Sequence, residues 1–427
     1  MLRRSLITLA QSVRGFCSVL GMTLLLVLAI EGGFRLKQQV SGELHHDPPV
    51  PDSYANSDWF RGFNQDYNDA RVLRWKPFLY FGRKPLVQSR TVNTDGLGRR
   101  VTPQPSTPSA PLARVFFFGG STMWGTAQRD SHTIAAVTSK RLQALAGPTA
   151  RIEVTNLGEN GYVSTQQLFS LILELREGHR PDVVVFLDGI NDVFSTVQMS
   201  EGGIPQNESK RAAEFKLGRQ LDRTGFARGF RKDLTSVGIL LLSTIKQLAL
   251  VDWVLSFAPT SAPNLLPTDA AVRATVGAYS ENVRIVEALG ARYGFTGIYI
   301  WQPTIHSTAK PLTSFEQGLM RSIANDPTQH RMKEVHLAIP AVLDTLIPAI
   351  APGRFLNAVG LFRNDSSDVY YDRVGHNTEA SIPTIVDAFW PLLKSALVAR
   401  HPQLGTTAPA LSAPAVSRPA VSVTPTR

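Results

Sequence analysis

The sequence predicts an α/β fold in which helices cover both faces of a parallel sheet. Short runs of mostly apolar residues, of the kind that form buried strands, occur at residues 114–118, 183–187 and 297–301, and residues 152–156 also read as a strand. Segments with helical spacing of apolar residues alternate with these runs, at residues 134–145, 165–177, 270–293 and 378–398. Strands that alternate with helices at this spacing are expected to pair in parallel, because each helix returns the chain to the same end of the sheet.

Composition supports a folded chain and excludes several classes of function. Of the 427 residues, 43% are hydrophobic and 18% are charged, which is enough apolar material for a sizeable core. The formal net charge is +10, but the basic residues form no dense run, so we expect no nucleic-acid partner. Cys17 is the single cysteine, which excludes an intramolecular disulfide and a cysteine metal cluster. The histidines form no HExxH motif, and we expect neither a metal nor another cofactor.

The N-terminal segment has the charge pattern of a membrane anchor. Basic residues precede a charge-free stretch at residues 15–30, and further charges follow from Glu31. We expect residues 1–14 to be a cytoplasmic stub and residues 15–34 a single span of the cytoplasmic (inner) membrane, with the body of the protein in the periplasm. A cleaved signal peptide and a buried core helix are the alternatives.

Beyond the anchor, the sequence divides into three further parts. Residues 35–112 are polar, rich in Pro and Gly, and predict a stalk that becomes a packed extension. Residues 113–398 contain the α/β alternation, interrupted by an insertion at residues 193–268. Residues 399–427 lack acidic and aromatic side chains and are expected to be disordered.

The insertion contains an apolar stretch at residues 234–258. Lys246, Gln247 and Asp252 in its middle argue against a second membrane span. An amphipathic lid or cap helix and an ordinary packed helix remain the two interpretations.

Small and polar residues follow three of the predicted strands. Ser121 comes after a Gly-Gly turn, Gly161 lies in the loop after the second strand, and Asn191 lies after the third. The carboxyl ends of parallel strands meet at one edge of the sheet, where ligands bind. A serine there can act as a nucleophile, and backbone N–H groups or an Asn amide can stabilise an oxyanion, although each residue alone is also ordinary turn chemistry.

An Asp/His pair directly precedes the last predicted helix. His376 can accept a proton from a serine at neutral pH, and a carboxylate such as Asp372 can fix its tautomer. Serine, oxyanion donors and the Asp/His pair in this order are what nucleophilic acyl transfer needs.

This combination resembles the SGNH (GDSL-type) hydrolases, a family named after Ser, Gly, Asn and His. The matching positions are Ser121 in FFFGGSTMWG, Gly161 in NLGENGY, Asn191 in DGIND and His376 in DRVGHNTEA. The resemblance covers about residues 113–398, and VNTDGLGRR upstream also looks like the membrane-anchored bacterial members. The family implies a flavodoxin-like three-layer sandwich and metal-independent ester hydrolysis.

The resemblance also implies a role for each residue. Ser121 would be the nucleophile and His376 the general base, then acid. The backbone N–H groups of Ser121 and Gly161, with the Asn191 side-chain amide, would form the oxyanion hole.

The sequence departs from the family pattern at two places. It reads Gly119-Gly120-Ser121 where the family usually has GDS, and Asp372 lies four residues before His376 where the family usually has three. Either Gly375 loops out, or the carboxylate comes from Asp368 or elsewhere, or a Ser–His dyad acts without one.

Five other side chains could belong to the site or have an ordinary structural role. His306 and Lys310 either line the site or lie in a solvated loop, which is the expected case, and Asp192 is expected to cap a turn rather than to react. Trp124 and Trp301 either line an acyl pocket or simply pack.

The expected function is that of a membrane-anchored extracytoplasmic serine esterase. Its substrate would be an O-acyl ester, for example an O-acetyl ester, of a cell-envelope glycan or lipid. The alternatives are an O-acyltransferase on the same fold and a non-catalytic module that binds a glycan or phosphate.

Overall fold

The computed structural model describes residues 50–104, 110–148, 150–223 and 265–405, together with scattered helical positions between residues 18 and 33. The chain divides into two compact units, Met1–Pro49 with Ser209–Asn264, and Val50–Glu208 with Leu265–Arg427. The stub at residues 1–14, most of the anchor, the apolar stretch at residues 234–258 and the tail from residue 406 lie outside the described residues. The second unit holds the sheet and every candidate site residue.

A five-stranded parallel sheet forms the centre of this unit. Its strands are β3 (Ala113–Gly119), β4 (Ile152–Asn156), β5 (Val183–Asp188), β6 (Thr296–Trp301) and β7 (Phe355–Asn357). They pair in the order β4-β3-β5-β6-β7, and every pair is parallel. The chain therefore enters at the second position of the sheet, crosses to the edge and returns, which is the flavodoxin-like order.

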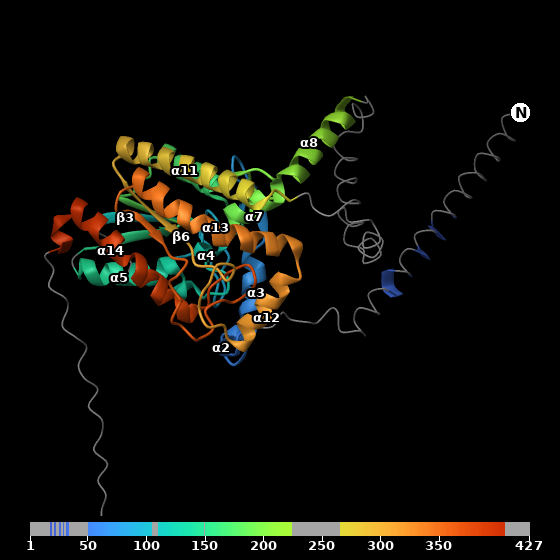
Figure 1. Cartoon of the computed structure of the whole chain (residues 1–427), viewed down its shortest axis with the longest axis horizontal. Coiled ribbons are helices and arrows are strands. Elements are labelled where there is room, and N and C mark those ends of the chain that lie inside the picture. The colour runs from blue at the N-terminus through green and yellow to red at the C-terminus, as the bar shows by residue number, and fades with distance from the viewer. Residues whose placement is uncertain are drawn as a thin grey trace, which may run out of the picture. The chain divides into compact units, whose positions relative to one another are not determined.

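Helices cover both faces of the sheet (Figure 1). One face carries α5 (Ile134–Ala146) and α14 (Ile382–Arg400). The other carries α6 (Ser164–Arg176), α7 (Ile190–Met199), α11 (Thr268–Tyr293) and α13 (Pro327–Ile350). The predicted fold class, a flavodoxin-like three-layer sandwich with a central parallel sheet, is confirmed.

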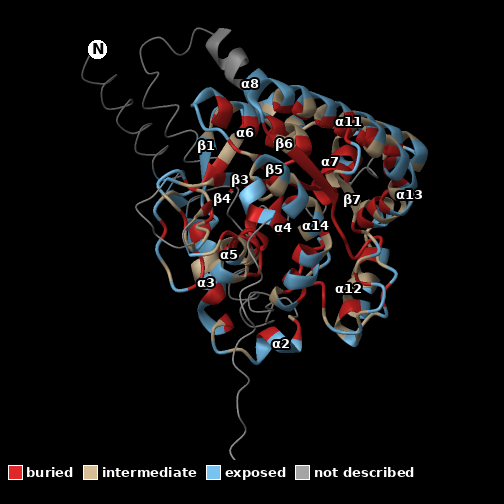
Figure 2. Cartoon of the chain, turned by 90° about the vertical axis from the view of Figure 1, so that its left-hand side faces the viewer, coloured by how far each residue is buried: buried red, intermediate tan, exposed pale blue. Residues whose placement is uncertain are grey.

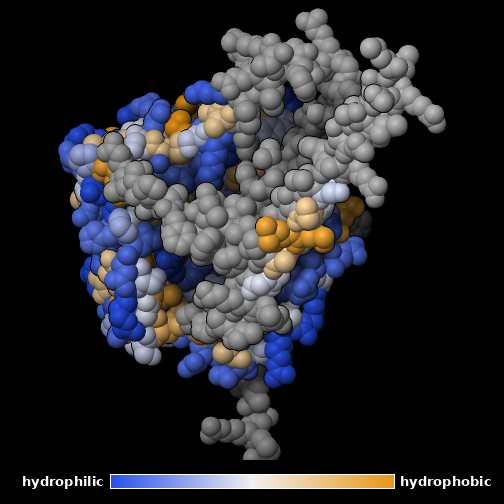
Figure 3. Space-filling view, turned by 90° about the vertical axis from the view of Figure 1, so that its right-hand side faces the viewer, coloured by the Kyte–Doolittle hydropathy of each residue, from blue (hydrophilic) through white to orange (hydrophobic). Residues whose placement is uncertain are grey.

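Alternation along the strands separates two apolar cores. Val115 and Phe117 of β3 pack toward α5 and α14, whereas Phe116 and Phe118 pack toward the opposite layer. The central strands β3, β5 and β6 are buried on both faces along most of their length, as the red centre of Figure 2 shows, which is why their sequences are mostly apolar. The part of the outer surface that Figure 3 colours is mainly hydrophilic, with apolar groups in separate areas.

Some elements have no clear signal in the sequence. Helix α13 contains Pro340 and Pro348, which interrupt its pattern, and β7 has only three residues of intermediate burial. Helix α12 (Ser314–Ala324) begins at a capping box formed by Thr313 and Glu316. Helix α8 (Glu208–Arg223) follows α7 in the chain.

Helix α14, with the turn before it, is the one segment of the described residues that is long and apolar enough to cross a membrane. Its side chains Phe389, Leu393 and Leu397 are buried in the core against the sheet. This packing accounts for its apolar face.

The residues before β3 form a packed extension on the same unit. It contains α2 (Asp52–Ala55), α3 (Phe60–Ala70) and an antiparallel hairpin of β1 (Leu73–Lys76) and β2 (Tyr80–Arg83). Its aromatic rings form a core of their own with Trp124 and Tyr371, comprising Tyr54, Trp59, Phe60, Phe63 and Tyr67. The extension therefore contacts the loops that follow the nucleophile strand and precede the last helix.

Candidate active site

Ser121 is the first residue of α4 (Ser121–Trp124), the short helix that follows β3. Both preceding glycines are required by close packing. A Cβ atom on Gly119 would lie 2.6 Å from the Cβ of Met123, and one on Gly120 would lie 2.1 Å from Nδ2 of Asn191. Because Ser121 begins a helix, its backbone N–H has no acceptor in a preceding turn. The residue is 5% exposed, at the carboxyl edge of the sheet.

Ser121, His376 and Asp372 form a continuous hydrogen-bonded chain. Oγ of Ser121 lies 2.6 Å from Nε2 of His376, and Nδ1 of His376 lies 2.6 Å from Oδ2 of Asp372. Since Nδ1–H donates to the carboxylate, Nε2 is left as the acceptor for the serine hydroxyl. This is the geometry in which a histidine can deprotonate a serine.

Gly375 accommodates the extra residue between Asp372 and His376. Its φ of +92° lies in the left-handed region, which glycine adopts without strain. The turn lets the backbone N–H groups of Val374 and His376 donate to Oδ1 of Asp372, at 3.0 and 3.3 Å. Asp368 is occupied elsewhere, because it accepts the hydroxyl of Thr313 at 2.5 Å. Of the two carboxylates considered from the sequence, the structure therefore brings Asp372 to the histidine.

The Asp372 carboxyl is held in its charged form. Burial raises its pKa, but His376 and the two backbone N–H donors oppose this, and the net shift is below the usual value. A carboxylate beside Nδ1 stabilises the positive charge that His376 acquires when it takes a proton.

The Asn191 amide packs against Gly120, directly before Ser121, and is bonded to Tyr162, the residue after Gly161. Asn191 lies in the first turn of α7, and its Nδ2 donates to the carbonyl of Tyr162 at 3.0 Å. Gly161 lies just before Tyr162 with a φ of +80°. Gln206, which the sequence did not single out, donates from Nε2 to Oδ1 of Asn191 at 3.2 Å. This bond fixes which end of the Asn191 amide carries the N–H groups.

The carboxyls of Asp188 and Asp192, which flank Asn191 in the chain, are both buried. Asp192 accepts both the hydroxyl and the backbone N–H of Ser164, at 2.6 and 3.0 Å, and so ties the start of α7 to the start of α6. Burial raises the pKa of both Asp188 and Asp192, and for Asp188 the neighbouring Asp192 adds to the effect. Asp192 thus anchors a helix start, close to the turn-capping role expected for it.

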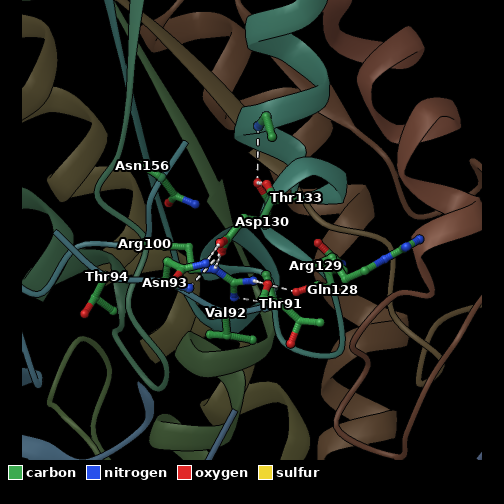
Figure 4. Close-up of polar contacts among 12 residues, drawn as sticks. Thr91, Val92, Asn93, Thr94, Arg100, Gln128, Arg129, Asp130, Thr133 and Asn156 are labelled. Atoms are coloured by element: carbon green, nitrogen blue, oxygen red, sulfur yellow. Dashed lines mark hydrogen bonds and ion pairs between the residues drawn. The ribbon is translucent and has the colours of Figure 1, made fainter. Parts of the chain in front are cut away.

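Arg100 supports the loop that follows the nucleophile helix (Figure 4). Its guanidinium is buried, with Nε bound to Oδ1 of Asp130 at 2.5 Å and Nη2 bound to the carbonyl of Gln128 at 2.6 Å. It also lies 4.6 Å from the centre of the Trp124 ring. Gln128 in turn donates to the carbonyl of Asn377 at 3.1 Å, beside the histidine. The extension and this loop together set the distance between Ser121 and His376.

A second buried ion pair supports the loop that carries Gly161. Nε of Arg83 lies 2.5 Å from Oε1 of Glu159, and both side chains are less than a tenth exposed. The hydroxyl of Tyr162 donates to the carbonyl of Phe81 at 2.5 Å, and Asn160 donates to the hydroxyl of Tyr67 at 3.1 Å. Hairpin and helix of the extension thus hold the loop on both sides.

The expectation of a solvated loop at His306 and Lys310 is wrong. Both residues are buried, at 1% and 5% exposure. Lys310 pairs with Glu316 inside the fold and donates to the carbonyl of Ser367 at 2.9 Å. His306 Nε2 lies 3.1 Å from the carbonyl of Arg373, so it supports the turn that precedes His376. A buried Lys–Glu pair has no local signal in the sequence, because its partner comes from the next helix.

The two tryptophans pack rather than line an open pocket. Trp124 is fully buried between the arginines of the extension, and Trp301 is fully buried against Tyr279, with ring centres 5.3 Å apart. Among the described residues, no cluster of three or more His, Cys, Asp or Glu side chains could hold a metal ion.

No protein-family model and no curated protein matches the sequence. Among solved structures, an α/β hydrolase enzyme from the metagenome of Lake Arreo, Spain, is similar at 15% identity and a TM-score of 0.34, over 66% of this chain and 96% of that one. A psychrotrophic esterase from Pseudoalteromonas sp. is similar at 11% identity and a TM-score of 0.32, over 67% and 98% of the two chains. A variant of an acetyl xylan esterase from Geobacillus stearothermophilus is similar at 15% identity and a TM-score of 0.28, over 66% and 95%.

Proposed function

We propose that the chain is a serine esterase that cleaves an O-acyl ester through a Ser121 acyl-enzyme. The observation that carries this proposal is the unbroken chain of short contacts from Ser121 Oγ through His376 to Asp372. A non-catalytic binding module would require no such contact, and a phosphate-binding turn would have no use for the histidine.

Each group has a role in the proposed reaction. As Ser121 Oγ attacks the acyl carbonyl carbon, His376 Nε2 takes the hydroxyl proton. The carbonyl oxygen gains the negative charge and accepts hydrogen bonds from the N–H groups of Ser121 and Gly161 and from Nδ2 of Asn191. His376 then gives its proton to the departing alcohol oxygen, and a water repeats the sequence to release the acid.

Asn191 can serve as a donor because of its surroundings. Its amide nitrogen carries two N–H groups, and the one that donates to Tyr162 leaves the other for the oxyanion. Gly120 lets the amide approach, since any side chain there would collide with it. Preorganised donors of this kind cost no rearrangement during the reaction.

The substrate proposal rests on the expected location. An anchor at residues 15–34 would place the body beside the outer face of the cytoplasmic membrane, where O-acylated glycans and lipids are available. The positive-inside pattern supports this topology, as do the exposed apolar side chains at the helical positions Met22, Leu25 and Leu26.

The test is an ester assay on the full-length chain. With p-nitrophenyl acetate and longer esters, we expect Ser121→Ala and His376→Ala to lose at least about a hundredfold in kcat. Ser131→Ala, at an exposed serine ten residues further on, is the control and should keep full activity. A fluorophosphonate probe should label the wild type and the control but not Ser121→Ala.

The outcomes separate the competing functions. Turnover that survives Ser121→Ala would contradict the proposed nucleophile. Labelling of Ser121 without release of acid from any ester would point to the acyltransferase, which should then acetylate an added oligosaccharide. Neither labelling nor turnover would leave a binding module as the interpretation.

A further inference from the structure

An exposed apolar surface lies on the extension, outside the candidate active site. We call it the hairpin surface. It consists of large hydrophobic side chains on the β1–β2 hairpin and on the turns that follow it, namely Val72, Leu73, Trp75, Phe78, Leu86 and Leu97. Trp75, Phe78 and Leu86 are each exposed by about two thirds, at 68%, 67% and 69%. Leu73 and Trp75 lie on the same face of β1, because alternate residues of a strand share a face, and large apolar side chains exposed together mark an interaction site.

The hairpin is held so that these side chains point outward. Gln166 donates to the carbonyl of Leu79 at 2.9 Å, and Leu79 itself is fully buried, which fixes the turn. Phe78 and Leu86 have positive φ angles, of 66° and 57°, which are rare for bulky residues. Backbone strain of this kind persists where the position of the side chain matters.

Charge indicates the kind of partner. Within residues 71–100 Asp95 is the single acidic residue, and the basic residues are Arg71, Arg74, Lys76, Arg83, Lys84, Arg90, Arg99 and Arg100. Arg83 and Arg100 are used inside the fold, but Arg71, Arg74 and Lys84 are exposed beside the apolar side chains. Aromatic and aliphatic side chains surrounded by exposed cations match the interface of an anionic bilayer, where rings enter the headgroup layer and cations meet lipid phosphates.

We propose that the hairpin surface docks on an anionic lipid bilayer, with Trp75 and Phe78 in the headgroup region. A lipid surface fits better than a protein partner, because the apolar side chains project from a strand, a hairpin turn and two loop turns rather than lining a groove. The contact is independent of the ester chemistry and of the N-terminal segment.

Local depth measurement tests this proposal on the full-length chain. In a Cys17→Ser background, Phe78→Cys carries a nitroxide spin label, and Leu337→Cys on α13 is the matched control, because Leu337 is 59% exposed outside the hairpin surface. The protein is reconstituted with phosphatidylcholine vesicles, with and without phosphatidylglycerol. Collision rates with oxygen, which concentrates in lipid, are compared with those of a water-soluble nickel complex.

With phosphatidylglycerol present, we expect the label at position 78 to gain collisions with oxygen and lose collisions with nickel, while position 337 keeps the profile of water. Adding Arg74→Glu and Lys84→Glu should return position 78 toward that profile. Equal, water-like profiles at both positions would overturn the proposal. Shielding of position 78 from both reagents would also overturn it, since that result means cover by protein. Circular dichroism and the ester assay confirm that the labelled variants are folded.

Discussion

At the scale of single residues, Gln206 is the group that a sequence comparison with the SGNH pattern misses. Gln206 is not one of the reacting groups, but its Nε2 donates one hydrogen bond to Asn191 and so orients the Asn191 amide. A side-chain amide that is free to rotate presents its oxygen to the oxyanion as readily as its nitrogen, which would cancel its benefit. We regard Gln206 as a positioning residue.

Gln206→Leu should therefore lower kcat while leaving KM nearly unchanged. The fall should be smaller than the loss of about 10²–10³ that follows removal of an oxyanion donor, because Asn191 itself remains. Gln88→Leu, at an exposed glutamine of the extension, is the control. A Gln206→Leu variant with wild-type kcat would show that Tyr162 alone holds the amide.

The buried histidine pair gives the fold a dependence on pH. His306 and His336 stack with ring centres 5.4 Å apart. Burial lowers the pKa of His306 from 6.5 to about 4, and burial with the nearby His306 lowers that of His336 well below 6.5. Below pH 6.5 the unfolded chain binds protons that the folded chain does not, so stability falls as the pH drops from 6.5 toward 4.

His336→Leu should flatten this part of the stability profile. The substitution removes one group that must stay neutral in the fold, and it fills a fully buried position with an apolar side chain. Denaturant midpoints measured between pH 6.5 and 4 for the wild type and the variant give the slope. His330→Leu, at a half-exposed histidine on the same helix, is the control and should leave the slope unchanged. An unchanged slope in His336→Leu would mean that His336 is protonated in the fold.

At the scale of elements, the loop that carries Gly161 depends on the hairpin through the Arg83–Glu159 pair. Burial raises the pKa of Glu159, and Arg83 opposes this shift. Removing one partner leaves the other charge buried without compensation, which costs about 3–5 kcal/mol. Arg83 also donates to the carbonyl of Arg71 at 2.7 Å, so its loss affects the hairpin as well.

We expect Glu159→Leu and Arg83→Met each to destabilise the protein by roughly that amount, and the double variant to recover part of the loss. Chemical denaturation measures all three. Asp269→Asn, which breaks an exposed ion pair with Arg273, should leave the midpoint unchanged. If the double variant loses as much as the sum of the two single variants, the pair does not act as a unit.

At the scale of the whole molecule, the sequence predicts those strands and helices whose apolar residues follow a local pattern. The four long strands and the helices that alternate with them can be predicted within a few residues, because β3, β5 and β6 are mostly apolar and β4 alternates apolar and polar residues. The order of the sheet and the candidate site followed from the resemblance to the SGNH hydrolases. Helix α13 and β7 were not predicted, since prolines interrupt the first and the second is too short.

The supporting groups of the site could not be found in the same way. Arg100 lies 30 residues before Asp130, Gln128 lies 249 residues before Asn377, and Lys310 reads as an ordinary loop lysine. Nothing near Arg100 and Gln128 in the chain shows that they will be buried, because their partners come from distant segments. Lys310 has its ion partner Glu316 six residues away, but it also donates to the carbonyl of the distant Ser367. Burial of a charged side chain depends on the tertiary structure, which a local pattern does not contain.

Tyr54 connects an early segment of the chain to a late one. Its phenol donates to the carbonyl of Ala127 at 2.9 Å and accepts a hydrogen bond from the N–H of Glu379 at 2.7 Å. A residue near the start of the fold is therefore bonded to one near its end. During synthesis, Ser121, Gly161 and Asn191 are all made before the proposed base. A growing chain that ends before residue 376 thus holds a nucleophile without a means of activating it. If Ser121 and His376 act as proposed, acyl chemistry begins only after the segment that carries His376 has been made and has packed beside Ser121.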